Sequence, residues 1–66
     1  MTQIRELRKA KGLTISKLSH AAGVNASVIS WAELGKLPAS RAVREALSKY
    51  YDRKEENLFQ ENGFAI

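Results

Sequence analysis

Two short helical segments joined by a single glycine constrain this chain more than any other feature of its sequence. The apolar residues of the first segment recur at helical spacing, namely Ile15, Leu18 and Ala22. Thr14 can cap that helix, and Gly23 follows it, where a left-handed backbone brings no Cβ clash. Asn25 can then cap a second helix. We therefore predict one helix over residues 15–22 and another over residues 25–34.

A helical wheel divides the second segment into two faces. The face expected to pack on the protein holds Asn25, Val28, Ile29 and Ala32. The opposite face holds Ala26, Ser27, Ser30, Trp31 and Leu34. We expect this outward face to be exposed, and an exposed tryptophan normally marks a contact surface.

The rest of the sequence predicts three further helices. Thr2 can cap a first helix that ends at Gly12 and leaves its basic residues in solvent, namely Arg5, Arg8, Lys9 and Lys11. The clearest helical period follows a Ser40 cap and comprises Val43, Ala46, Leu47 and Tyr50. A polar break over residues 51–54 precedes a short last helix over Glu55–Gln60. Residues 1–66 are thus expected to form a single all-α domain of five helices around a small core.

Residues 15–36 resemble the helix-turn-helix of the lambda-repressor-like, or Xre and Cro, family of DNA-binding proteins. The residues that carry the resemblance are Leu18, Ser19, Ala22, Gly23, Val24, Ile29, Glu33, Gly35 and Lys36. A weaker likeness continues over residues 4–13 and 38–59. The resemblance implies that Asn25–Leu34 is a recognition helix in the major groove of double-stranded DNA. It further implies a sequence-specific transcriptional regulator, a Cro-like repressor of phage or mobile-element type, cytoplasmic and bound to the nucleoid.

The charge of the chain is unevenly distributed. Up to Arg44 the chain has eight Lys and Arg residues and two acidic residues, a net charge of +6. From Glu45 onward it has three Lys and Arg residues and five acidic residues, a net charge of −2. A basic front suits a polyanionic partner, although such charges can also serve only to keep a small domain soluble.

The family resemblance assigns DNA contacts to two groups of residues. Base contacts are expected from Asn25, Ala26, Ser27, Ser30 and Trp31. These offer no Arg, Lys or Gln, so readout would rest on serine hydroxyls and on apolar contacts with thymine methyl groups. Phosphate contacts are expected from Thr14, Ser16, Lys17, Lys36 and Arg41, helped by the amino end of the leading helix. Each of these cations could equally be a solvated surface residue. Family members commonly carry Gln where this chain has Ile15, so one family contact is missing.

The carboxyl-terminal tail, residues 61–66, contains two large apolar side chains, Phe64 and Ile66. A frayed tail is the default for a terminus, but such residues are poor choices for a solvated end. They can pack on the chain's own core or on a partner. We expect a homodimer whose self-complementary patch comprises Tyr51, Leu58, Phe59, Phe64 and Ile66, and whose two recognition helices lie about 34 Å apart.

The sequence offers no catalytic, metal or cofactor site. His20 is the single histidine, with Ser16 one turn earlier and no acid placed to orient it, and cysteine is absent. No membrane segment and no pocket are expected. The alternative to DNA binding is a protein-binding module, an antirepressor or antitoxin, that keeps the fold and uses Trp31 and Leu34 as a hot spot for a second regulatory protein.

Overall fold

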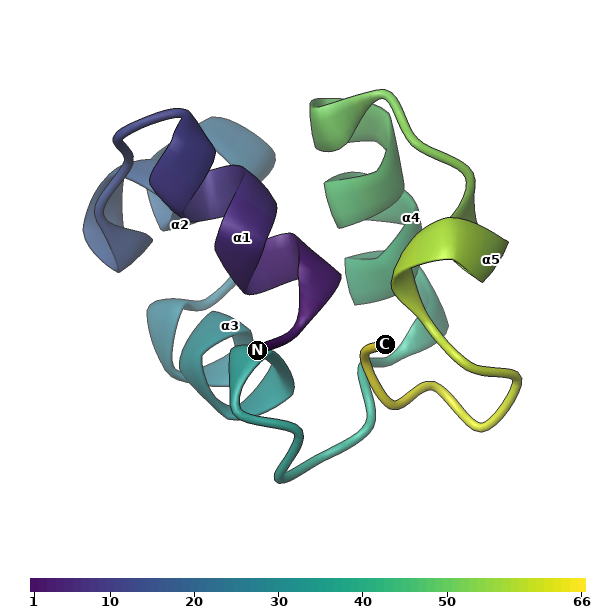
Figure 1. Cartoon of the computed structure of the whole chain (residues 1–66). Coiled ribbons are helices and arrows are strands. Elements are labelled where there is room, and N and C mark those ends of the chain that lie inside the picture. The colour runs from purple at the N-terminus through teal and green to yellow at the C-terminus, as the bar shows by residue number, and fades with distance from the viewer.

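A computed structural model describes all residues from 1 to 66 (Figure 1). Its five helices are α1 (Gln3–Ala10), α2 (Ile15–Ala22), α3 (Ala26–Glu33), α4 (Arg41–Tyr51) and α5 (Glu55–Leu58). The only β-type pairing is an isolated bridge between Phe59 and Ala65. The predicted all-α fold of five helices is therefore confirmed. None of these helices has the length and apolar character that crossing a membrane requires.

The turn between α2 and α3 has the predicted geometry. The hydroxyl of Thr14 accepts a hydrogen bond from the amide of Lys17 at 3.1 Å. Gly23 is left-handed, with φ of 71°. The side chain of Asn25 accepts from the amide of Ser27 at 2.8 Å, which caps α3. The amino ends of both helices are thus capped, because each cap satisfies an amide that no intrahelical carbonyl reaches, and Gly23 closes the carboxyl end of α2 by donating its amide to the carbonyl of Ser19 at 2.9 Å.

The start of α1 differs from the prediction. Thr2 precedes the helix with extended backbone, but its side chain caps no amide of α1. Its hydroxyl instead donates to the carbonyl oxygen of Glu33 at 2.8 Å. The amino terminus is therefore attached to the last residue of α3, because that carbonyl lies at a helix end where it has no intrahelical donor.

The second half of the chain confirms one cap and corrects two boundaries. Ser40 caps α4 by accepting from the amide of Val43 at 3.3 Å. This helix continues through Tyr51 and ends at Asp52, which is left-handed with φ of 55°. The last helix stops at Leu58 rather than at Gln60, because Phe59 is already extended.

One core joins all five helices. Its fully buried side chains are Ile4, Leu18, Ile29, Leu47 and Leu58, one from each helix. Val24, Ala32, Ala39, Tyr51 and Phe59 complete the buried cluster. The core-facing positions predicted for α3, Ile29 and Ala32, are buried as expected, whereas Asn25 is exposed at its cap position.

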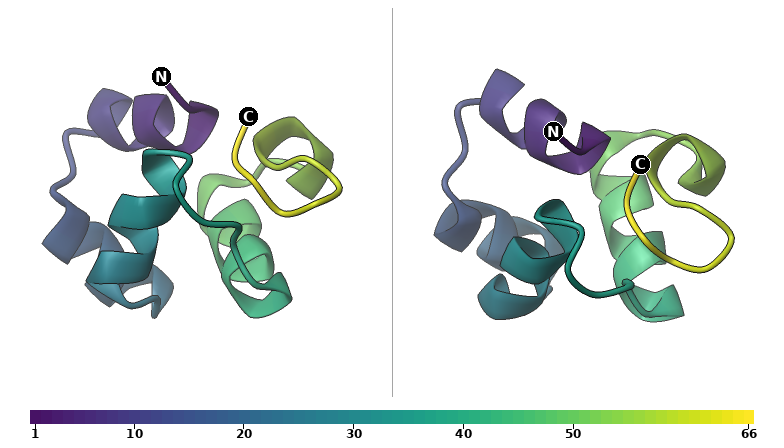
Figure 2. Two further views of the ribbon diagram at one scale, coloured as in Figure 1. Left: turned by 90° about the horizontal axis from the view of Figure 1, so that it is seen from below. Right: turned by 60° about the horizontal axis from the view of Figure 1, so that its bottom comes forward.

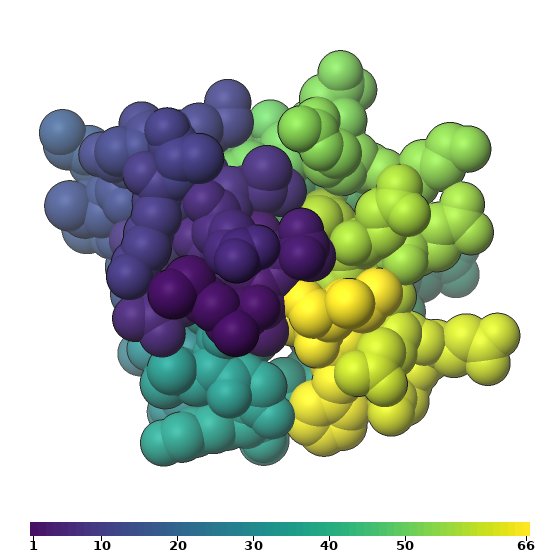
Figure 3. Space-filling model, viewed as in Figure 1, coloured from purple at the N-terminus to yellow at the C-terminus, as the bar shows by residue number.

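The carboxyl-terminal tail packs on the chain itself, at the start of α1, before α4 and at the end of α5. Ile66 donates its amide to Leu58 at 2.9 Å and accepts from the amide of Gln3 at 2.7 Å. Gly63 accepts from the amide of Ala39 at 2.9 Å. Figure 2 shows the tail curving back from α5 toward the start of α1, and Figure 3 shows it lying against the first residues. The default of a frayed tail is wrong here.

This placement also corrects the expected dimer patch. Tyr51, Leu58 and Phe59 are each at most 3% exposed and belong to the core of a single chain. Within the expected patch, Ile66 is 47% exposed and Phe64 is partly exposed. The expectation that all five residues form a surface patch was wrong, because Tyr51, Leu58 and Phe59 belong to the core cluster and the tail pairs with the backbone of Leu58 and Phe59.

Candidate nucleic-acid interface

The outward face of α3 is accessible, as the helical wheel predicted. Asn25, Ala26 and Ser27 are exposed at its amino-terminal end, and Ser30 is half-buried. Trp31 is 46% exposed and Leu34, just after the helix, is 51% exposed. Four of the five expected base-contacting residues are therefore exposed, including Asn25, which the helical wheel had placed on the protein-facing side.

An ion pair that the sequence analysis missed holds the other side of α3. The Nε atom of Arg8 lies 2.8 Å from one carboxylate oxygen of Glu33, and its Nη2 atom lies 3.1 Å from the other. Nη1 of Arg8 also donates to the carbonyl of Leu13 at 2.8 Å. The Arg8 and Glu33 side chains are 11% and 3% exposed, so the placement of Arg8 in solvent was wrong. Helical spacing carried the signal, since Arg8 lies four residues after Ile4 and Glu33 four residues after Ile29.

The electrostatic consequences of this pair reach the neighbouring Tyr51. The hydrogen bonding of Arg8 to the carboxylate of Glu33, which accepts from it, raises the pKa of Arg8 above its usual value. Burial, followed by the negative charge of Glu33, raises the pKa of Tyr51 to about 12. The hydroxyl of Tyr51 has no hydrogen-bond partner in the protein. Because Glu33 is the only acid of α3 and is neutralised by Arg8, no free carboxylate opposes a polyanion on this helix.

The residues expected to contact phosphate are all exposed. Thr14, Ser16 and Lys17 lie at the amino end of α2, although the amide of Lys17 is already taken by the Thr14 cap. Lys36 lies in the loop after α3. Arg41 opens α4 and pairs with Glu45 at 3.2 Å, a pair whose side chains are 84% and 61% exposed. Figure 2 shows α3 and α4 starting on the same side of the molecule, and Arg41 is the first residue of α4.

Comparison with known proteins identifies the family. A family model described as a helix-turn-helix domain matches residues 2–59. The chain belongs to the helix-turn-helix domain family. This agrees with the Xre and Cro resemblance, and it indicates DNA binding and a role in transcription regulation. No curated protein and no solved structure matches the chain.

The helix-turn-helix domain has a small apolar pocket beside Trp31 that the sequence analysis did not predict. Its volume is about 240 Å³. The residues that line it come from α3, the following loop and α4, namely Val28, Trp31, Leu37, Pro38, Ser40 and Val43. The helical wheel placed Val28 and Trp31 on different faces of α3. No local sequence pattern shows that the loop after α3 brings Leu37 and Pro38 beside both residues.

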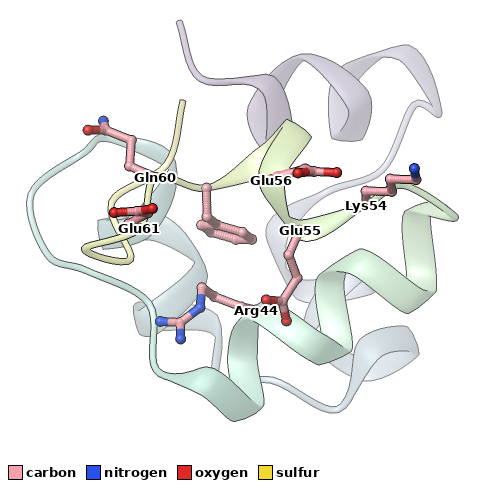
Figure 4. A pocket seen from close by; sticks show the side chains of 7 residues that line it. Arg44, Lys54, Glu55, Glu56, Gln60 and Glu61 are labelled. Atoms are coloured by element: carbon pink, nitrogen blue, oxygen red, sulfur yellow. The ribbon is translucent and has the colours of Figure 1, made fainter.

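A second hollow of about 680 Å³ lies between α4, α5 and the residues that follow α5 (Figure 4). The charged ends of its lining side chains spread around an open rim, namely Arg44, Lys54, Glu55, Glu56 and Glu61. The expectation that so small a domain has no pocket was wrong. Small-molecule sites are lined mostly by apolar side chains, and here Phe59 is the only one, so we assign this hollow no ligand.

Helix-turn-helix domains are typically not enzymes, and the histidine of this one lies on the surface. His20 and Ser16 are both exposed on α2, and no hydrogen bond joins their side chains. The structure brings together no group of three or more His, Cys, Asp or Glu residues that could hold a metal ion.

Proposed function

We propose that this helix-turn-helix domain binds double-stranded DNA sequence-specifically, with α3 in the major groove, and acts as a transcriptional repressor. The observation that carries the proposal is the open outer face of α3 on a helix fixed at both ends. Asn25 caps one end, and Thr2 and Arg8 hold the other. A helix held in this way can present its side chains to base edges without reordering on binding. A Cro-like role in a phage or mobile element follows the resemblance to that family.

Phosphate contacts supply most of the affinity in this proposal. The exposed cations that supply these contacts are Lys17 in the first turn of α2, Lys36 in the loop after α3 and Arg41 at the start of α4. Arg41 loses little by leaving Glu45, since exposed ion pairs contribute only about 0.2–1 kcal/mol. With three phosphate contacts, a plot of the logarithm of the DNA association constant against the logarithm of the salt concentration should have a slope of about −3 per monomer.

The test is a salt titration of binding to a random duplex. We expect Lys36→Gln to weaken binding to all sequences and to reduce the slope by about one. Lys49→Gln is the matched control, because Lys49 is also exposed but lies in the last turn of α4, away from Arg41. Absence of binding at low salt would refute the proposal, and equal effects of the two substitutions would refute the assignment of the surface.

We further propose that two copies bind together on DNA. The molecule measures 27 × 21 × 21 Å, so two copies fit side by side when their recognition helices enter major grooves about 34 Å apart. The proposed contact is the accessible remainder of the apolar tail, namely the exposed Ile66 and the partly exposed Phe64. Sedimentation of the complex with a selected duplex should give two proteins per duplex. Ile66→Ser should reduce the cooperative binding of the second copy, because it removes the apolar side chain but keeps the backbone hydrogen bonds of residue 66. A ratio of one protein per duplex for the unaltered chain would refute the dimer.

The exposure of two large apolar residues, Trp31 and Leu34, favours protein binding as the second candidate. A second regulatory protein would then dock on this surface. Trp31→Ala should in that case leave DNA binding unchanged and abolish the protein complex, whereas DNA binding through α3 requires Trp31→Ala to reduce sequence discrimination.

A further inference from the structure

The turn that begins the carboxyl-terminal tail contains the only Asn–Gly pair of the chain, Asn62 followed by Gly63. Gly63 donates its amide to the carbonyl of Gln60 at 2.9 Å and accepts from the amide of Ala39 at 2.9 Å. The side-chain oxygen of Asn62 accepts from the amide of Phe64 at 3.1 Å. Asn62 is exposed and Gly63 is buried, so the pair joins an accessible carboxamide to a backbone site that is packed on the rest of the chain.

This pair places an unhindered nucleophile next to a carboxamide carbon. A bond from the backbone nitrogen of Gly63 to Cγ of Asn62 closes a five-membered ring, and glycine has no side chain that blocks the approach. The other two asparagines, Asn25 and Asn57, are followed by Ala26 and Leu58, whose side chains crowd the same approach. Asparagine is one of the thermally labile residues of proteins, and Asn62 is the one in this chain with an open path to reaction.

We propose that Asn62 is a site of spontaneous deamidation and that the reaction releases the carboxyl-terminal tail irreversibly. The nitrogen of Gly63 attacks Cγ of Asn62, the bond from Cγ to Nδ2 breaks, and the side-chain nitrogen leaves as ammonia with the proton from the amide. Water then opens the cyclic imide, so the net reaction consumes one water and releases one ammonia. Opening at the backbone carbonyl gives isoaspartate, in which the main chain passes through Cβ and is one atom longer.

The folded tail slows this reaction because it holds the attacking amide. That amide must lose its proton, and in the folded chain the proton is donated to the carbonyl of Gln60. Gly63 also has no room to move, since a Cβ at this position would lie 2.9 Å from the carbonyl oxygen of Ala39 and 2.9 Å from Nη1 of Arg44. The tail itself buries no large apolar side chain completely, and segments of this kind open locally at low cost in free energy. The reaction therefore proceeds from the minority of molecules in which the tail is open.

Isoaspartate prevents the tail from closing again. A main chain that is one atom longer between Gln60 and Gly63 cannot keep both the turn and the fit of Gly63 against Ala39. Deamidation thus converts a reversible opening into a permanent one. The effect reaches beyond the tail, because Ile66 accepts a hydrogen bond from Gln3 at the start of α1, the helix that holds α3.

The first test follows the mass of the intact chain and of its peptides during incubation in mildly alkaline buffer, below the Tm. Asn62 should lose its amide, with isoaspartate as the main product, while Asn25 and Asn57 keep theirs and serve as internal controls. The reaction at Asn62 should be slower in the folded chain than in the chain unfolded in urea. Asn62→Gln is the matched control variant, because it keeps a carboxamide but places it one carbon farther from the nitrogen of Gly63, and its mass should not change.

The second test measures what the product does to the fold. The converted protein carries one additional negative charge, so ion-exchange chromatography separates it from the unconverted chain. Its Tm should fall close to that of a chain that lacks residues 63–66. Asn62→Asp adds the same charge without lengthening the main chain and keeps an oxygen that accepts from Phe64, so this variant should retain most of the Tm.

Three results would overturn the proposal. Reaction at Asn62 that is no faster than at Asn25 and Asn57, even in urea, refutes the modification site. Equal rates in the folded and the unfolded chain show that the tail does not protect Asn62. Equal Tm values for the converted protein and for Asn62→Asp show that isoaspartate leaves the tail in place.

Discussion

The Arg8–Glu33 pair gives the sharpest test of how α3 is held. Glu33→Gln keeps the shape of the side chain and removes its charge, which leaves the guanidinium of Arg8 nearly buried with no counter-charge. Breaking a buried pair from one side costs about 3–5 kcal/mol. A domain of 66 residues has a total stability of roughly 3–10 kcal/mol at about 0.05–0.15 kcal/mol per residue. The substitution should therefore remove much of the stability and lower the Tm by at least about 12 °C.

The assay is thermal and urea unfolding followed by circular dichroism, and the chain supplies a matched control. Glu45→Gln makes the same chemical change in the exposed pair with Arg41, where side chains are 84% and 61% exposed, and should cost only about 0.3–0.5 kcal/mol. Replacing both partners, Arg8→Met with Glu33→Leu, should recover most of the loss, because no uncompensated charge remains in the interior. Equal melting shifts for Glu33→Gln and Glu45→Gln would refute the claim that the buried pair anchors α3.

Four further predictions concern two glycines, the tail and pH. Gly23→Ala should cost about 1–2 kcal/mol in urea unfolding, from left-handed strain alone, because its Cβ would have no neighbour within 4 Å. Gly63→Ala should cost more in the same assay, because its Cβ would lie 2.9 Å from the carbonyl oxygen of Ala39; equal costs would show that the tail does not pack there. Deleting residues 63–66 should lower the Tm of the monomer, whereas an unchanged Tm would mean that the tail hydrogen bonds contribute nothing. Tyr51 has a pKa of about 12 in the folded protein and about 10 in the unfolded chain, so the unfolded state releases its proton first and the free energy of unfolding should fall between about pH 10 and 12. Tyr51→Phe should remove this pH dependence without destabilising the protein at pH 7. An unchanged alkaline profile in this variant would exclude Tyr51 as its source.

The sequence predicted the features that depend on neighbouring residues. The caps at Thr14, Asn25 and Ser40 and the left-handed Gly23 follow from local rules of side-chain hydrogen bonding and backbone sterics. The outward face of α3 followed from helical period alone.

Features that depend on distant residues were missed. The hydroxyl of Thr2 could cap α1 or donate to a distant carbonyl group. Local reasoning predicted the cap, whereas the hydroxyl donates to the carbonyl oxygen of Glu33, 31 residues away. Phe59 looked available for a partner because nothing in its neighbourhood shows that Ala65 returns to pair with it. The pocket beside Trp31 likewise depends on the path of the loop from Gly35 to Ser40, which no periodic pattern describes.

The composition of α3 explains why its distant contacts matter for DNA binding. The helix has only eight residues, and Val28, Ile29 and two serines give it low helix propensity. Isolated helices shorter than about 12 residues are marginal in water, so α3 cannot hold its shape or direction by itself. Asn25 fixes its amino end locally, but its carboxyl end depends on Thr2 and Arg8, which lie in or just before α1. In the proposed binding mode, with α3 in the major groove, DNA binding depends on α1, and we expect substitutions at Arg8 to weaken it although Arg8 is turned away from the outward face of α3.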